Sequence, residues 1–68
     1  MEKISKKLGI NIKKIRAKKK MSQGNLCRKS NIDRGYMSAI ENGKNNITIG
    51  TLAKIAEALE VSPDKLLK

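Results

Sequence analysis

Arg34, Gly35 and Tyr36 stand together near the start of one predicted helix, in the segment NIDRGYMSAIENGK at residues 31–44. The arginine guanidinium donates hydrogen bonds in a planar fork that fits guanine O6 and N7 or the oxygens of a phosphate. A glycine has no side chain to hold the helix away from another surface. Tyr36, the only aromatic residue, offers a ring and a hydroxyl. These residue types indicate a helix end shaped to approach a partner closely.

The charge of the chain indicates what kind of partner this is. Its 68 residues include 16 Lys+Arg, 6 Asp+Glu and no His, for a formal net charge of +10. A charge so far from neutrality favours a polyanion, which includes nucleic acid, an anionic membrane surface and an acidic protein. The alternative is a solvated lysine-rich surface, and this is the simplest interpretation of Lys18, Lys19 and Lys20. The length allows one small domain, residues 1–68, with a modest core.

Other classes of protein are disfavoured by what the composition lacks. With no histidine and a single cysteine, Cys27, there is no evident nucleophile and base pair, no disulfide and no multi-cysteine zinc site. No glycine-rich phosphate loop is present. We therefore predict that the protein is not an enzyme and uses no metal or other cofactor, and that Cys27 is a core residue. The sequence shows no signal peptide and no long apolar run, which predicts a cytoplasmic protein without a membrane partner. No separate ligand domain is evident, so we expect no small-molecule ligand.

Apolar residues recur at helical spacing and show no alternation typical of a strand. In a first helix, Ile4, Leu8, Ile12 and Ile15 lie on one face, which we expect to pack on the core. A fourth helix follows a cap at Thr48 or Asn46. Its apolar face comprises Ile49, Leu52, Ile55, Ala56 and Leu59.

Two shorter helices, at residues 22–30 and 33–42, are predicted between these stretches. Ser22 and Asp33 are suitable N-caps, and Gly43 is suitable for the position just after a helix end. A last short helix is expected near the C-terminus, with Pro63 at its first position. The predicted fold is therefore all-α, with five short helices in a compact arrangement.

The two middle helices and their short connection form a helix-turn-helix over residues 22–42 approximately. Asn31 suits the turn, because asparagine tolerates the left-handed backbone conformation. In this motif the second helix enters the major groove of DNA with its N-terminal residues leading. Arg34 and Tyr36 occupy these leading positions, so we predict that their partner is double-stranded DNA.

The inward face of the second helix of the motif, residues 33–42, indicates which of its residues are free to contact DNA. Met37 and Ile40 form an inward stripe, so we expect Tyr36 at the DNA or the groove edge rather than in the core. We expect Arg34 to contact a base, although the alternative is an ordinary surface arginine that pairs with Asp33. Small side chains on the same helix allow close approach, namely Ser38, Ala39 and Asn42.

The run from Leu8 to Leu67, about nine-tenths of the chain, resembles the lambda-repressor-like, XRE-type helix-turn-helix family. The resemblance is carried by LGINIKKIRAKKKMSQGNLCRKSNIDRGYMSAIENGK and ITIGTLAKIAEALEVSPDKLL. Within the family, NIDRGYMSAIENG followed by KNNITIGTL is most similar to the small controller proteins of restriction–modification systems. Lys20 departs from the family, which commonly has glycine there. Gly35 and Ala39 replace longer polar side chains, so readout would rest on Arg34 and on DNA shape.

The resemblance implies roles for individual positions. The positions that read bases or adjoining phosphates would be Arg34, Gly35, Tyr36, Ser38 and Ala39. The positions that hold DNA phosphates would be Ser22, Gln23, Asn42, Lys44 and Asn45, with helix capping as the alternative role of Ser22 and Gln23. Arg16 and Glu41 would form an internal salt bridge between the first and third helices.

The small size of the chain and the motif both favour assembly. Small domains gain buried surface by association, and regulators with this motif usually bind DNA as dimers. We expect the dimer surface at Ile47, Ile49, Val61 and Leu67, with internal packing of all four as the alternative. The prediction is a homodimeric, sequence-specific transcriptional regulator on a two-fold-related operator, which blocks or recruits RNA polymerase according to where that operator lies.

Two other functions are compatible with the same residues. An antitoxin-like or other protein-interaction module could use this fold, and a stoichiometric acidic partner would distinguish it. A binder of nucleic acid or membrane surfaces that acts by charge alone would show no preference for DNA sequence.

Overall fold

The computed structural model describes residues 2–68, which form four α-helices and one 3-10 helix. The α-helices are α1 (Glu2–Lys18), α2 (Gln23–Ser30), α3 (Arg34–Glu41) and α4 (Ile49–Leu59), and the 3-10 helix is Pro63–Leu66. The residues described include no strand, so the predicted all-α class is confirmed.

The prediction of a fifth α-helix was wrong in type. The last element is a 3-10 turn of four residues, in which Lys65 N donates to Ser62 O at 3.0 Å and Leu67 N to Asp64 O at 3.1 Å. Bonds that span three residues suit such a short segment, because an α-helical ladder needs a longer run in which to repeat. Pro63 stands at the start of the turn, as predicted.

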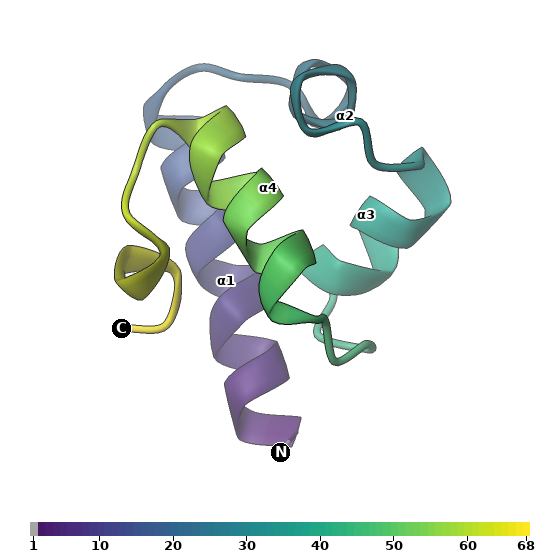
Figure 1. The fold of residues 1–68 in the computed structure, drawn as a ribbon, viewed down its shortest axis with the longest axis vertical. Coiled ribbons are helices and arrows are strands. Elements are labelled where there is room, and N and C mark those ends of the chain that lie inside the picture. Colours follow the sequence, from purple (N-terminus) through teal and green to yellow (C-terminus); the bar gives the residue numbers. More distant parts are fainter. Residues whose placement is uncertain (1) are drawn as a thin grey trace.

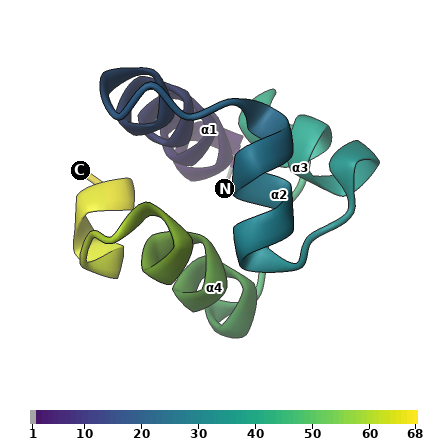
Figure 2. The same cartoon turned by 90° about the horizontal axis from the view of Figure 1, so that it is seen from above.

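The helices enclose one apolar core. Helix α1 packs on α3 and on the 3-10 helix, and α2 packs on α3 and α4 (Figure 1). Seen from above, α2 lies between α3 and α4 (Figure 2). Every element contributes to the core, whose largest fully buried side chains are Ile12, Leu26, Met37, Ile40, Ile55, Leu59 and Leu66. Cys27 is also buried there, as predicted.

One residue that was expected in the core lies outside it. Ile4 is 61% exposed because the first turn of α1 extends beyond the other helices (Figure 1). Ile49, which shares the spacing of the apolar face of α4 and was expected at the dimer surface, is 85% exposed at the first position of that helix. Helical spacing assigned Ile4 to an inward face, but at the end of a helix no neighbouring element covers that face.

The helix starts follow from local sequence. Three short polar side chains accept hydrogen bonds from backbone N–H groups three residues later, as N-caps do. Ser22 accepts from Asn25 N at 3.0 Å, Asp33 from Tyr36 N at 3.0 Å, and Thr48 from Thr51 N at 3.1 Å. All three caps were predicted, with Thr48 selected over Asn46.

The four α-helices end in the same way. After each one, a residue adopts the left-handed conformation and the next N–H donates to the carbonyl five residues earlier, which is the Schellman pattern. The left-handed residues are Lys20, Asn31, Gly43 and Glu60. Asn31 and Gly43 were predicted for such positions. Lys20 has the left-handed φ of 56° that the family's glycine would adopt more easily.

This conformation gives a prediction for Lys20. An L-residue in the left-handed region costs about 1–2 kcal/mol. We expect Lys20→Gly to raise the free energy of unfolding by about 1 kcal/mol over Lys20→Ala, because both variants remove the charge but only glycine removes the strain. Urea denaturation followed by circular dichroism measures the difference. Equal stability of the two variants would contradict this explanation.

Among residues 2–68 there is no helix that is both long enough and apolar enough to cross a membrane.

Candidate nucleic-acid interface

Helices α2 and α3 are joined by the short connection from Asn31 to Asp33, which gives the predicted helix-turn-helix. Asn31 closes α2 with φ 57° and ψ 40°, and Ile32 N then donates to Cys27 O at 3.1 Å. The Asp33 carboxylate caps α3 directly afterwards. The connection is therefore set by local hydrogen bonds, which determine where α3 begins.

Helix α3 has a buried side and an open side. Met37, Ile40 and Glu41 are buried. The buried positions of Met37 and Ile40 confirm the predicted inward stripe. Arg34, Gly35 and Tyr36 are exposed in the first turn, so Tyr36 is not a core residue. Two further predicted base readers are half-buried along the helix, Ser38 and Ala39. The five predicted base-reading positions therefore all lie on α3, three of them exposed in its first turn and two half-buried farther along.

Gly35 has a local structural role as well as its predicted role at DNA. A Cβ atom at this position would lie 3.1 Å from Asp33 Oδ2, the carboxylate that caps the helix. This distance is shorter than ordinary van der Waals contact, so the capping carboxylate would have to shift by a few tenths of an ångström to admit a side chain. Glycine therefore allows the Asp33 cap and keeps the leading turn of α3 free of bulk.

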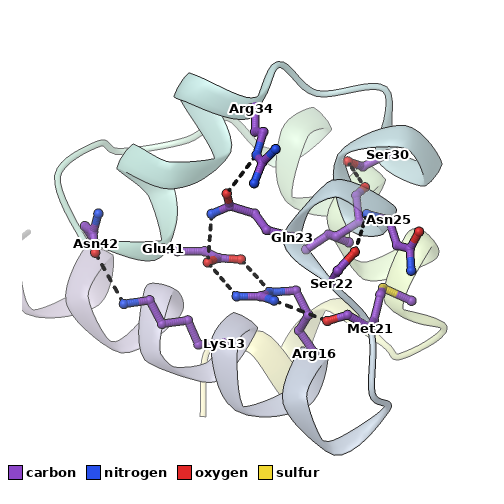
Figure 3. Close-up of polar contacts among 11 residues, drawn as sticks. Lys13, Arg16, Met21, Ser22, Gln23, Asn25, Ser30, Arg34, Glu41 and Asn42 are labelled. Atoms are coloured by element: carbon purple, nitrogen blue, oxygen red, sulfur yellow. Dashed lines mark hydrogen bonds and ion pairs between the residues drawn. The ribbon is translucent and has the colours of Figure 1, made fainter.

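Arg34 does not pair with its neighbour Asp33. Its Nε donates to Gln23 Oε1 at 3.4 Å, and Asp33 accepts from the backbone of Tyr36 instead. Gln23 is the first residue of α2 and is half-buried. The leading turns of α2 and α3 therefore meet through these two side chains (Figure 3).

An ion pair connects α1 to the end of α3, as the resemblance implies. Arg16 Nε lies 2.9 Å from Glu41 Oε2, and Arg16 Nη2 donates to Glu41 Oε1 at 3.1 Å. The Glu41 side chain is only 2% exposed and that of Arg16 is 21% exposed. Arg16 Nη1 also donates to Met21 O at 3.2 Å, so one guanidinium joins α1, the segment before α2, and α3 (Figure 3).

The predicted phosphate positions lie at both ends of the motif. Ser22 and Gln23 are at the start of α2, where backbone N–H groups point outward. Asn42 and Lys44 are exposed after α3, while Asn45 is half-buried. The Ser22 hydroxyl already accepts from Asn25 N, so capping is its established contact.

The structure adds Lys13, which the sequence reasoning missed. Lys13 Nζ donates to Asn42 Oδ1 at 3.3 Å, which brings a cation from α1 to a predicted phosphate position (Figure 3). With its oxygen held by Lys13, Asn42 has its amide N–H groups left to donate. The sequence contained one indication of this contact. Lys13 lies one turn before Arg16 on α1, and Asn42 directly follows Glu41. The expected Arg16–Glu41 ion pair therefore brings Lys13 and Asn42 close together.

A further electrostatic feature near the motif is the buried thiol of Cys27. Burial raises the pKa of Cys27 above its usual range, and the nearby Arg34 opposes this only in part. A raised thiol pKa keeps Cys27 protonated and poorly nucleophilic at neutral pH. Cys27 therefore acts as a small core residue beneath the motif.

The predicted dimer residues divide into two pairs. Ile49 and Leu67 are exposed, whereas Ile47 and Val61 pack partly against the core. The alternative in which all four pack internally is therefore wrong for Ile49 and Leu67. Two of the four, Ile47 and Leu67, line an open groove of about 310 Å³, together with Ile4, Ser5, Leu8, Asn46 and Leu52.

Comparison with known proteins identifies the class to which this fold belongs. Residues 12–66 match the helix-turn-helix family, and the chain therefore belongs to that family. It is similar to control protein C.MunI from a Mycoplasma species, with 36% identity over 67 residues, 97% of this chain and 90% of that protein. Control protein C.BamHI from Bacillus amyloliquefaciens is 38% identical over 60 residues, 87% of this chain and 74% of that protein.

Solved structures show the same similarity. The restriction–modification controller protein C.AhdI from Aeromonas hydrophila gives a TM-score of 0.87 with 32% identity, over 91% of this chain and 94% of that one. C.Esp1396I, solved bound to a 25 base pair operator site, gives a TM-score of 0.81 with 47% identity, over 87% of this chain and 78% of that one. The family predicted from the sequence, and the similarity to controller proteins within it, are confirmed.

Proposed function

We propose that this protein is a homodimeric, sequence-specific DNA-binding transcriptional regulator, and that it acts as the control protein of a restriction–modification system. The observation that carries the proposal is the leading turn of α3, where Arg34, Gly35 and Tyr36 are exposed beside the N-terminus of α2. The net charge of +10 and the similarity to a controller protein solved on its operator support it.

In this mechanism α3 lies in the major groove and the ends of the motif hold the phosphates. Arg34 reads a guanine through its guanidinium fork, and Tyr36 contacts a thymine methyl or a phosphate. Gly35, Ser38 and Ala39 let the helix lie close to the base edges. On either side, the phosphate contacts are made by Ser22, Gln23, Asn42, Lys44 and Asn45. The activity is occupancy of DNA in the cytoplasm and requires neither catalysis nor a cofactor.

The test of this proposal is selection of binding sites from a random duplex library at about 0.15 M salt, where non-specific attraction is partly screened. A sequence-specific dimer enriches a two-fold-related motif whose half-sites are about one helical turn, roughly 34 Å, apart. Recovery of unselected DNA would overturn the proposed function and leave a binder that acts by charge.

Replacing Arg34 tests the base-reading role. We expect Arg34→Ala to cost about 1–3 kcal/mol at the selected operator and to relax selectivity at one base position in each half-site. Lys44→Ala is the matched comparison, because loss of a phosphate contact weakens binding to all sequences alike and lowers the salt slope by about 1. Titrations on operator and random duplexes measure both effects. An equal loss on all sequences for Arg34→Ala would contradict its reading role.

We further propose that the dimer forms over the groove and the adjacent Ile49. The groove walls are mainly apolar, and Ile4 and Leu67 stand exposed at its edges. The two polar residues of the groove form a hydrogen bond with each other, in which Ser5 Oγ donates to Asn46 Oδ1 at 2.6 Å. A second copy that covers this surface would bury apolar side chains that one copy leaves in water.

Replacing Ile49 tests this dimer surface. Burial of an isoleucine contributes about 1.5–3 kcal/mol, so we expect Ile49→Asp to raise the dimer dissociation constant by at least about tenfold. Ile10→Asp is the control, because Ile10 is 51% exposed on α1 and does not line the groove. Sedimentation equilibrium measures both variants. The same shift for both, or none for Ile49→Asp, would contradict this location.

A further inference from the structure

The peptide unit that joins Leu66 to Leu67 is held at both of its polar atoms. Its oxygen, Leu66 O, accepts from Asn11 Nδ2 on α1 at 2.8 Å, and its N–H, on Leu67, donates to Asp64 O at 3.1 Å. The two bonds come from different parts of the chain, because Asn11 is 55 residues from Leu66 whereas Asp64 belongs to the same 3-10 helix. This short helix packs against both α1 and α4 (yellow in Figure 1).

The bond from Asn11 supplies what the end of a short helix lacks. The last carbonyl groups of a helix have no partner within that helix, and a backbone carbonyl can only accept a hydrogen bond. The NH₂ group of the Asn11 amide therefore turns to Leu66 O. The same segment also has an ion pair between Lys68 and Asp64, but their side chains are 76% and 60% exposed, and such pairs contribute little. Asn11 is half-buried, so its bond is less open to competition from water.

The two leucines joined by this peptide have opposite surroundings. Leu66 is fully buried in the core, whereas Leu67 is 45% exposed and lines the open groove. Because a peptide unit is planar, bonds to both its oxygen and its N–H fix the plane and, with it, the position of the Leu67 Cα atom. The Leu67 side chain is therefore attached to a backbone that is already held in place beside the groove.

We propose that Asn11 is a positioning residue for the dimer surface and acts through Leu67. Asn11 does not itself line the groove. It holds the peptide from the side of α1, so that Leu67 is ordered before a second copy of the chain arrives. An apolar side chain on a free backbone would lose conformational freedom on association, and this loss would weaken the dimer. The inference rests on the proposed function, because it assumes a dimer that forms over the groove.

A double-mutant cycle between Asn11 and Leu67 tests this proposal. The measured quantity is the dimer dissociation constant from sedimentation equilibrium. We expect Asn11→Ala, which removes the donor, to raise this constant about three- to tenfold, the scale of coupling between interacting residues. In the Leu67→Ala background the same substitution should leave the constant unchanged, because the side chain that the bond positions is already absent. A merely structural role of Asn11 would not depend on Leu67.

Two further variants accompany the cycle. Lys68→Ala is the matched control, because it removes the exposed ion pair of the same segment and leaves the Asn11 bond in place, so it should keep the wild-type dissociation constant. Asn11→Asp keeps the size of the side chain but replaces the donating NH₂ group by an accepting oxygen, and it should raise the constant as Asn11→Ala does. Far-ultraviolet circular dichroism verifies that each variant is folded before its dimer is measured.

The possible outcomes separate this inference from the proposed function. If Leu67→Ala and Ile49→Asp both leave the dissociation constant unchanged, the proposed dimer surface fails and the inference fails with it. If these two variants weaken the dimer while Asn11→Ala and Asn11→Asp do not, only the inference is overturned. An equal rise with and without the Leu67 side chain would also overturn it, because Asn11 would then act on the dimer independently of Leu67.

Discussion

Gly9→Ala should destabilise this protein by about 3 kcal/mol or more, which lies at the upper end of the range for overpacking a core. Gly9 lies in α1 where that helix crosses the end of α3. A Cβ atom there would lie 2.5 Å from Glu41 O and 2.7 Å from Ile40 O. These are backbone atoms in the last turn of a helix, so no side-chain rotation relieves the overlap. For a chain of 68 residues, stability is expected at about 3–10 kcal/mol, and such a loss would leave a large unfolded fraction.

The matched control for this substitution is Gly50→Ala in the first turn of α4. There an added Cβ has Thr48 Oγ1 at 3.8 Å as its nearest neighbour, which is ordinary contact. We expect a gain of about 0.4–1 kcal/mol from the lower entropy of the unfolded chain. Urea denaturation followed by far-ultraviolet circular dichroism measures both variants. Wild-type stability of Gly9→Ala would mean that α1 and α3 can separate without cost at this crossing.

Glu41→Ala should have the second largest effect. It leaves the Arg16 guanidinium without its carboxylate and removes the acceptor of the Gln23 amide. Breaking a buried ion pair from one side costs about 3–5 kcal/mol, and we expect the lower end because Arg16 keeps some access to water. The loss should appear in the free energy of unfolding, measured by urea denaturation followed by circular dichroism.

Replacing both members of the ion pair distinguishes its electrostatic role from its packing. Arg16→Met together with Glu41→Leu leaves no unpaired charge, so we expect most of the lost stability to return. A double variant as unstable as Glu41→Ala would contradict the unpaired charge as the cause of the loss.

The parts of the fold that were predictable from sequence are those governed by local chemistry. Asp33 was predicted as a cap and Asn31 and Gly43 as left-handed residues, because each property depends on one side chain and the adjacent backbone. The inward position of Met37 and Ile40 followed from spacing on a single helix. These features do not depend on how distant elements are arranged.

The features that escaped prediction depend on where different elements meet. Periodicity placed Ile4 on an inward face, but it contains no information on how far the neighbouring helices extend. The close approach at Gly9 exists only because α1 crosses α3 there. The same holds for the candidate site, where the Arg16–Glu41 pair followed from the family resemblance. The position of Gln23 between Glu41 and Arg34 depended on packing that no single helix specifies.

The two-sided construction of α3 has a consequence for how such a protein can change its operator during evolution. Met37, Ile40 and Glu41 attach the helix to the rest of the chain, whereas Arg34 and Tyr36 are exposed. Under the proposed function, substitutions on the open side would alter DNA recognition at little cost in stability, since surface changes usually shift the free energy of unfolding by no more than about 0.5 kcal/mol. New binding specificities are accessible through single substitutions in a chain that stays folded, and duplicated copies can diverge in their targets without first acquiring compensating changes in the core.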